Sequence, residues 1–231
     1  MSKDSNRTDI SKSFKKNFSV FVRNRSLLIG SIMILIVVLS AIFADVIAPY
    51  EYDYADMSNK LLRPSGEFLF GTDDFGRDMF SRIIYGSRIA LRVALLAAAI
   101  EIALGVTIGM LSGYYGGTVD RILSFFADLT WSMPPIIMSM AVITVLGKGM
   151  DNVIIAIAVV SWAQYARVVR AKTQALKNMA FVETAVAFNE SNAAIMLRYI
   201  LPNIVPSIIV LASLSIPATI TSTTALSFLG L

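Results

Sequence analysis

The hydrophobic residues of this chain gather in runs long enough to cross a membrane as helices. The longest apolar runs cover residues 27–44, 93–112, 129–147, 152–166 and 199–231. About 20 apolar residues in a helix span a hydrocarbon core about 30 Å thick. The run at 152–166 is short but can be extended, and 93–112 is interrupted only by Glu101. The pattern predicts an all-α, polytopic membrane protein with five spans.

Composition supports this prediction and narrows the chemistry. Hydrophobic residues make up 56% of the chain and charged residues only 16%, which is too little polar surface for a soluble fold. Histidine and cysteine are both absent, so the commonest metal ligands and the usual neutral-pH general base are missing. We therefore expect no metal site, no cofactor and no catalytic site in this chain.

The charge pattern predicts an orientation. Residues 1–26 carry seven lysines and arginines against two aspartates, whereas 49–82 carries seven carboxylates. The positive-inside rule places the N-terminus in the cytoplasm and 49–82 outside. The positive charge, concentrated in the tail and in 167–198, suits anionic membrane lipids better than nucleic acid. A cleaved signal peptide is the alternative for the first run, but its length and the lack of an Ala-x-Ala site favour an uncleaved anchor.

Four parts follow from this topology. The basic tail is 1–26, where Phe14, Phe18 and Phe21 among lysines predict an interfacial helix. The first span is 27–48, an external segment is 49–87, and the core is 88–231. No internal repeat is visible in the sequence.

An inner segment, 167–203, is too long for a simple connection between packed spans. Phe181, Ala185 and Phe188 follow i, i+4, i+7 spacing, which predicts a short helix near 180–190 with one apolar edge. Asn189 suits the end of this helix, because asparagine tolerates the left-handed backbone conformation.

This segment resembles the permease subunits of ABC importers. Their motif of Glu-Ala-Ala, three residues, Gly, and a spacer to Leu-Pro corresponds to Glu183-Thr184-Ala185, Asn189 and Leu201-Pro202. Thr184 replaces the middle alanine and Asn189 replaces the glycine. Both changes keep the expected helix in place, since Asn189 retains access to positive φ.

Further motifs narrow the resemblance to the C-type permease of the dipeptide, oligopeptide and nickel branch. They are, in chain order, Gly71 to Asp78, Ser81-Arg82, Tyr85-Gly86, Gly113 to Gly117 with Asp120-Arg121, Tyr165 to Arg170, and Leu226 to Gly230. The resemblance implies a type I ABC importer permease fold. Family members continue into a sixth span, so we expect the natural protein to extend beyond this sequence.

The resemblance implies one half of a translocation path for peptides in a bacterial or archaeal plasma membrane. The implied partners are a homologous permease, two cytoplasmic ATPases and an external solute-binding protein. The segment near 180–190 would be the coupling helix, with its contacts at Phe181, Glu183, Thr184, Ala185, Phe188 and Asn189. An interfacial helix resting on lipid is the alternative.

Other interpretations of the function of the whole chain stay open. The same architecture could import nickel or a metal chelate. A self-contained secondary transporter or channel is a different class, although it would be expected to show an inverted repeat and more spans.

Polar residues inside the spans are candidates for lining the path or for pairing between helices. They are Glu101, Asp128, Ser213 and Thr219. The external segment Gly71 to Asp78 fits neither a phosphate loop nor an EF-hand. We expect a structural turn there, with Arg77 or Arg82 pairing to Asp73 or Asp78.

Overall fold

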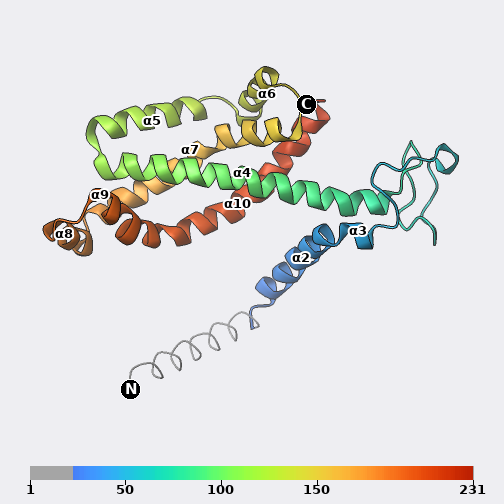
Figure 1. Ribbon diagram of the computed structural model, residues 1–231, viewed down its shortest axis with the longest axis horizontal. Helices are drawn as coiled ribbons and strands as arrows, with labels where there is room; N and C mark the ends of the chain where they lie inside the picture. The colour runs from blue at the N-terminus through green and yellow to red at the C-terminus, as the bar shows by residue number, and fades with distance from the viewer. Residues whose placement is uncertain (1–22, 231) are drawn as a thin grey trace. The chain divides into compact units, whose positions relative to one another are not determined.

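The computed structural model describes residues 23–230, and helices make up most of this part of the chain (Figure 1). The interfacial helix expected around Phe14, Phe18 and Phe21 lies outside the described residues. Within residues 23–230, four helices are long and apolar enough to span a membrane, and a bent pair of helices can supply a fifth span. This agrees with the five spans expected from the hydrophobic pattern.

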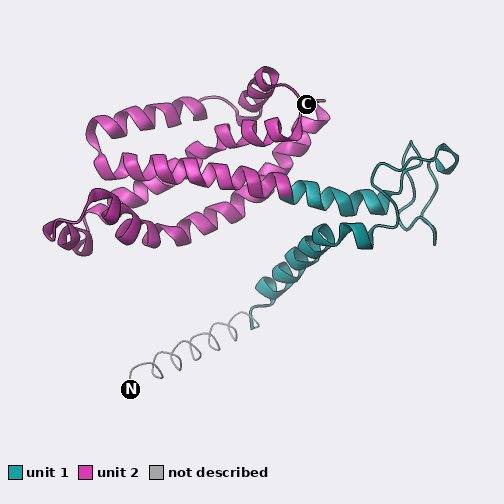
Figure 2. Ribbon diagram, viewed as in Figure 1, with its two compact units in different colours: residues 1–91 teal, residues 92–231 magenta. Residues whose placement is uncertain are grey.

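The chain forms two compact units, Met1–Leu91 and Arg92–Leu231 (Figure 2). The first contains α2 (Arg25–Ile42), α3 (Ala44–Ile47), the 3₁₀ turn η1 (Met57–Asn59) and the start of α4 (Met79–Tyr115). The second contains the rest of α4 and all later helices.

In the first unit, Arg88 joins α4 to the end of α2. Its guanidinium donates to both carboxylate oxygens of Asp45, at 3.0 and 2.9 Å, and to the carbonyls of Ala41 and Ile42. These bonds satisfy carbonyls that the end of a helix leaves without intrahelical partners.

The segment before α4 is a structural turn, as expected, and is built on Asp73. Arg77 pairs with Asp73 at 2.8 Å and Arg82 lies 3.4 Å from the same carboxylate. Burial of Asp73 opposes ionisation, but hydrogen bonds from Arg77 and from the backbone N–H of Phe75 prevail and lower the pKa of Asp73 to about 2. Asp78 does not pair with either arginine; it accepts from the N–H and hydroxyl of Ser81.

The second unit is a helical bundle with a bent third span. Its helices after α4 are α5 (Gly117–Trp131), α6 (Pro135–Leu146), α7 (Met150–Lys177), α8 (Ala180–Ala187), α9 (Asn192–Ala194), the π-helical η2 (Ile195–Ile200) and α10 (Leu201–Phe228). The span expected at 129–147 as one helix is a pair, α5 and α6, bent by 93°. Pro134 and Pro135 explain the break, because proline lacks the N–H that would continue α5.

The fourth span is longer than its apolar run. Helix α7 continues to Lys177, so Arg167 and Arg170 lie on its last turns and do not belong to a separate inner segment. The length of the connection expected over 167–203 was therefore overestimated. Helix propensity carries α7 beyond its apolar run, since arginine, lysine and glutamine are good helix formers.

A glycine stripe brings α4 and α7 into close contact. Gly105, Gly109 and Gly113 recur every fourth residue and are buried. A Cβ on Gly109 would lie 2.5 Å from the carbonyl oxygen of Ala166 and 2.9 Å from the Cβ of Val169. Small residues at this spacing are typical of packed membrane helices. The sequence therefore contains a signal for this contact, although the contact was not among the expected features.

Candidate functional site

Helix α8 comes after α7 and before α9, η2 and α10 in the chain, and its two faces differ in burial. Val182 and Ala185 are buried, whereas Phe181 is 40% and Phe188 is 80% exposed. The expected single edge of Phe181, Ala185 and Phe188 is therefore wrong. Val182 and Ala185 are three residues apart and share the inner face, while Phe188 follows the last helical residue and points away from that face.

The end of α8 is fixed by a Schellman motif. The N–H of Glu190 donates to the carbonyl of Ala185 at 3.1 Å, and that of Asn189 donates to Val186 at 2.9 Å. Asn189 has φ of 57°, which confirms the expected left-handed conformation. The hydroxyl of Thr184 is used within the helix, donating to the carbonyl of Ala180. Glu183 is exposed.

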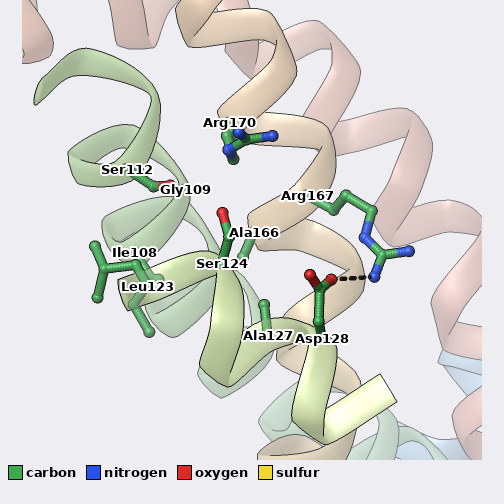
Figure 3. A pocket seen from close by; sticks show the side chains of 10 residues that line it. All are labelled: Ile108, Gly109, Ser112, Leu123, Ser124, Ala127, Asp128, Ala166, Arg167 and Arg170. Carbon is green, nitrogen blue, oxygen red and sulfur yellow. Dashed lines mark hydrogen bonds and ion pairs between the residues drawn. The ribbon is translucent and has the colours of Figure 1, made fainter. Parts of the chain in front are cut away.

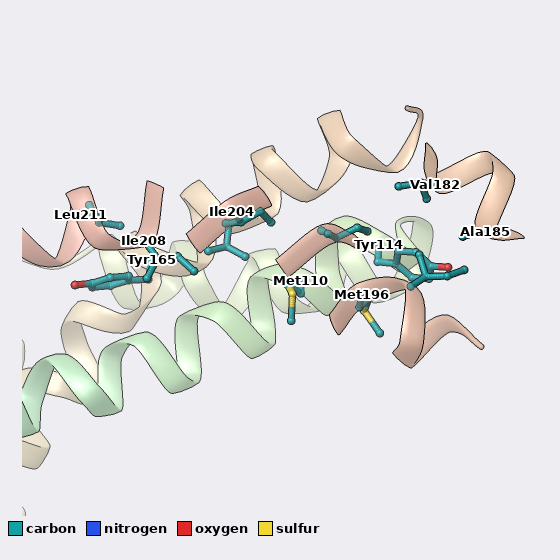
Figure 4. Packing of buried hydrophobic residues seen from close by; sticks show 12 residues of the cluster. Met110, Tyr114, Tyr165, Val182, Ala185, Met196, Ile204, Ile208 and Leu211 are labelled. Carbon is teal, nitrogen blue, oxygen red and sulfur yellow. The ribbon is translucent and has the colours of Figure 1, made fainter. Parts of the chain in front are cut away.

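The inner face of α8 belongs to the largest hydrophobic cluster of the second unit (Figure 4). Val182 and Ala185 lie beside Tyr114 of α4 and Met196 of η2. The cluster continues along the bundle through Met110, Tyr165, Val169, Ile195, Ile200, Ile204, Ile208 and Leu211. Because this packing is continuous, α8 and the spanning helices share one core.

Hydrogen bonds reinforce the same connection. The hydroxyl of Tyr114 donates to Asn192 Oδ1 and that of Tyr199 donates to Glu190 Oε1, both at 2.9 Å. Ser191 caps α9, accepting from the N–H of Ala194. The segment that follows α8 is thus held by Tyr114 of α4 and Tyr199 of η2.

A charged network lies between α5 and α7. Arg170 donates to the two carboxylate oxygens of Asp120, at 2.5 and 2.6 Å, and the hydroxyls of Ser112 and Ser124 also donate to Asp120. A bidentate guanidinium fixes orientation as well as distance. The pair joins two motifs recognised separately in the sequence, and nothing in the local spacing predicted that they meet.

Asp128 forms a second ion pair between the same helices. Its carboxylate lies 2.8 Å from Arg167 (Figure 3). The guanidinium of Arg167 also stacks over the Trp131 ring, 4.1 Å from its centroid. Both charged residues line a cavity of about 220 Å³ between α4, α5 and α7. This geometry favours the interhelical pairing expected as one alternative for Asp128.

Glu101 and Thr219 meet at a different cavity, of about 120 Å³. Glu101 is fully buried, and within residues 23–230 neither of its carboxylate oxygens has a hydrogen-bond partner. Ser213 lies apart from them; it is exposed, and its hydroxyl bonds to carbonyls of its own helix. The four polar candidates therefore occupy three separate places.

No group of three or more acidic residues that could hold a metal ion occurs in the described part of the chain. The absence of histidine and cysteine removes the other common ligands.

Comparison with known proteins gives consistent matches. Residues 105–231 match the family described as binding-protein-dependent transport system inner membrane component. Residues 12–64 match the N-terminal transmembrane domain of oligopeptide transport permease C.

Curated relatives cover nearly the whole chain. A dipeptide transport system permease protein DppC of Alkalihalophilus pseudofirmus is 38% identical over 94% of this chain and 72% of its own length. The glutathione transport system permease protein GsiD of Escherichia coli is 40% identical, covering 91% and 70%. The oligopeptide transport system permease protein OppC of Bacillus subtilis is 34% identical, covering 98% and 76%.

Among solved structures, a crystal structure of an amino acid ABC transporter with histidines is 17% identical, with a TM-score of 0.48. The match covers 67% of this chain and 77% of that one.

Proposed function

We propose, on the premise that this chain belongs to the family of binding-protein-dependent transport system inner membrane components, that it is the permease subunit of an ABC importer for peptides. Peptides are the solute class named for relatives that match more than nine-tenths of the chain: a dipeptide, glutathione and an oligopeptide. In this role the chain is a multi-pass inner membrane protein, and separate subunits hydrolyse ATP. Import of nickel or of a metal chelate is supported by the sequence resemblance alone.

The proposed importer contains a homologous second permease, two ATPases and an external solute-binding protein. The orientation follows from charge. The basic N-terminus and α8 lie in the cytoplasm, since Arg167, Arg170, Lys172 and Lys177 come immediately before α8. The acidic segment around Asp73 lies outside.

The observation that carries the mechanism is the two-sided packing of α8. Its exposed face offers Phe181 and Phe188 to a groove on an ATPase, while Val182 and Ala185 join it to the core shared with α4, α7 and α10. An apolar helix face in a groove is a common recognition mode. A displacement of α8 by the ATPase must then move packed side chains, because cores do not deform continuously.

An interfacial helix offers the competing explanation, since exposed phenylalanines can also enter the headgroup region of a bilayer. The two possibilities differ in what is lost when these rings are removed. If the rings contact an ATPase, removing them weakens the association of the ATPase with the permease. If they contact lipid, removing them leaves that association unchanged.

The experiment is co-purification of the ATPases with tagged permease carrying Phe181→Ser and Phe188→Ser together. We expect normal membrane levels, because neither ring belongs to the buried cluster, and at least a tenfold loss of bound ATPase. Phe75→Ser is the matched control: this ring is 54% exposed in the other unit and should not affect ATPase binding. Retention of the ATPases and of peptide uptake by the double variant would exclude α8 as the coupling element.

A further inference from the structure

The carboxylate of Glu101 has no partner in a position where one is normally required. It lies on α4, within a membrane span, with 0% of the residue exposed and with neither oxygen hydrogen-bonded in the described structure. Buried polar groups in proteins are almost always hydrogen-bonded, and a buried charge is costly unless it is paired. The two carboxylate oxygens of Glu101, which accept no hydrogen bond in the described structure, therefore need an explanation.

Three arginines of the same unit are paired with other carboxylates. Arg170 is bonded to Asp120, Arg167 to Asp128, and Arg92 lies 3.9 Å from Asp151. The neighbouring hydroxyl of Tyr165 is bonded to Ser215 at 2.6 Å. Nothing described in this unit pairs with Glu101, so a cationic group of another molecule would satisfy both of its oxygens.

The cavity beside Glu101 is suited to such a group. It is lined by α7 and α10, and its polar side chains are neutral: Ser161, Gln164, Ser215, Thr219 and Ser222. Its volume of about 120 Å³ holds a few water-sized groups but not a whole peptide. An ammonium group has three N–H donors and no acceptor, so one carboxylate with surrounding hydroxyl and amide oxygens can satisfy it completely.

We propose that Glu101 and this cavity form a subsite for the ammonium group of the transported solute, with Glu101 as the ion-pairing residue and the hydroxyls of α10 as additional acceptors. This inference rests on the proposed peptide import, because a peptide with a free amino terminus carries such a group. It also explains why the lining is otherwise uncharged: a single carboxylate recognises the one charge at that end of a peptide, while neutral hydroxyls do not restrict its side chains.

The test uses the purified complex of this chain with its second permease and ATPases, without the binding protein, so that the permease itself is measured. The probes are trialanine and N-acetyl-trialanine, which differ in the ammonium group, and binding is measured by calorimetry. We expect trialanine to bind at least tenfold more tightly than its acetylated form in the wild type. Glu101→Gln should abolish this difference by weakening trialanine alone.

Asp151→Asn is the control, because it removes the same charge from an exposed residue that does not line the cavity. Ser222→Ala keeps the carboxylate and should weaken trialanine severalfold, so the idea stays testable if Glu101→Gln does not assemble. Equal binding of the two peptides by the wild type, no measurable binding, or an equal loss of both in Glu101→Gln would each overturn the subsite.

A parallel uptake assay with the binding protein separates the two proposals. If the wild-type system takes up no peptide, the proposed function fails. If it takes up trialanine and Glu101→Gln does so with unchanged KM and maximal rate, the subsite alone fails.

Discussion

Substitution of neighbouring residues on α8 should separate its inner face from its outer face. Ala185→Asp introduces a carboxylate where the side chain is 4% exposed, whereas Val186→Asp introduces the same group where it is 56% exposed. Both substitutions introduce an aspartate, and they do so at adjacent positions of the same helix. Only the direction in which the side chain points differs.

The cost of Ala185→Asp is set by the cheaper of two responses. Keeping α8 in place buries an unpaired carboxylate, which costs several kcal/mol. Releasing α8 exposes the side chain of Val182 and the methyl of Ala185, which costs about 2–4 kcal/mol in lost apolar burial. Release is therefore the expected response, because the wild-type preference for docked α8, roughly 30- to 1,000-fold, is smaller than the penalty of the buried charge.

The assay is hydrogen exchange of the peptide covering 178–191 in the detergent-purified permease, followed by ATPase co-purification. We expect fast exchange and lost ATPase for Ala185→Asp. Val186→Asp should exchange like the wild type yet bind the ATPases weakly, since its charge lies on the outer face. Wild-type exchange in Ala185→Asp, or a tightly bound ATPase in Val186→Asp, would refute the assignment of the two faces.

Two more predictions concern other parts of the chain. Gly109→Ala should lower the thermal unfolding midpoint, because its Cβ collides with Ala166 and Val169 at a cost of about 1–3 kcal/mol; Gly86→Ala on the same helix, with no atom within 4 Å, should not lower it. The pKa of Asp73 is about 2, below its unfolded value near 3.9, so the stability it adds is present above about pH 4 and lost as the pH falls toward 2. Hydrogen exchange of 56–78, corrected for the intrinsic rate, should increase across that interval in the wild type and not in Asp73→Asn.

Particular residues show how far sequence reasoning reached in the candidate site. The left-handed backbone of Asn189 and the pairing of Arg77 with Asp73 were both expected and are both present. Each involves residues within four positions of one another, so local geometry decides it. The outward position of Phe188 and the inward position of Ala185 were not predicted correctly, since the surroundings of α8 come from α4 and η2.

The sequence by itself determined the class of this protein, because a helix satisfies its backbone hydrogen bonds internally and runs of about 20 apolar residues are long enough to cross a bilayer. It also determined where α8 ends, and the spacing of Gly105, Gly109 and Gly113 indicates a close-packing face on α4. Only the tertiary structure decided that Asp128 pairs with Arg167 while Glu101 has no partner in the described residues. Those outcomes depend on which faces of helices distant in the chain meet, and helical periodicity defines a face without specifying what packs against it.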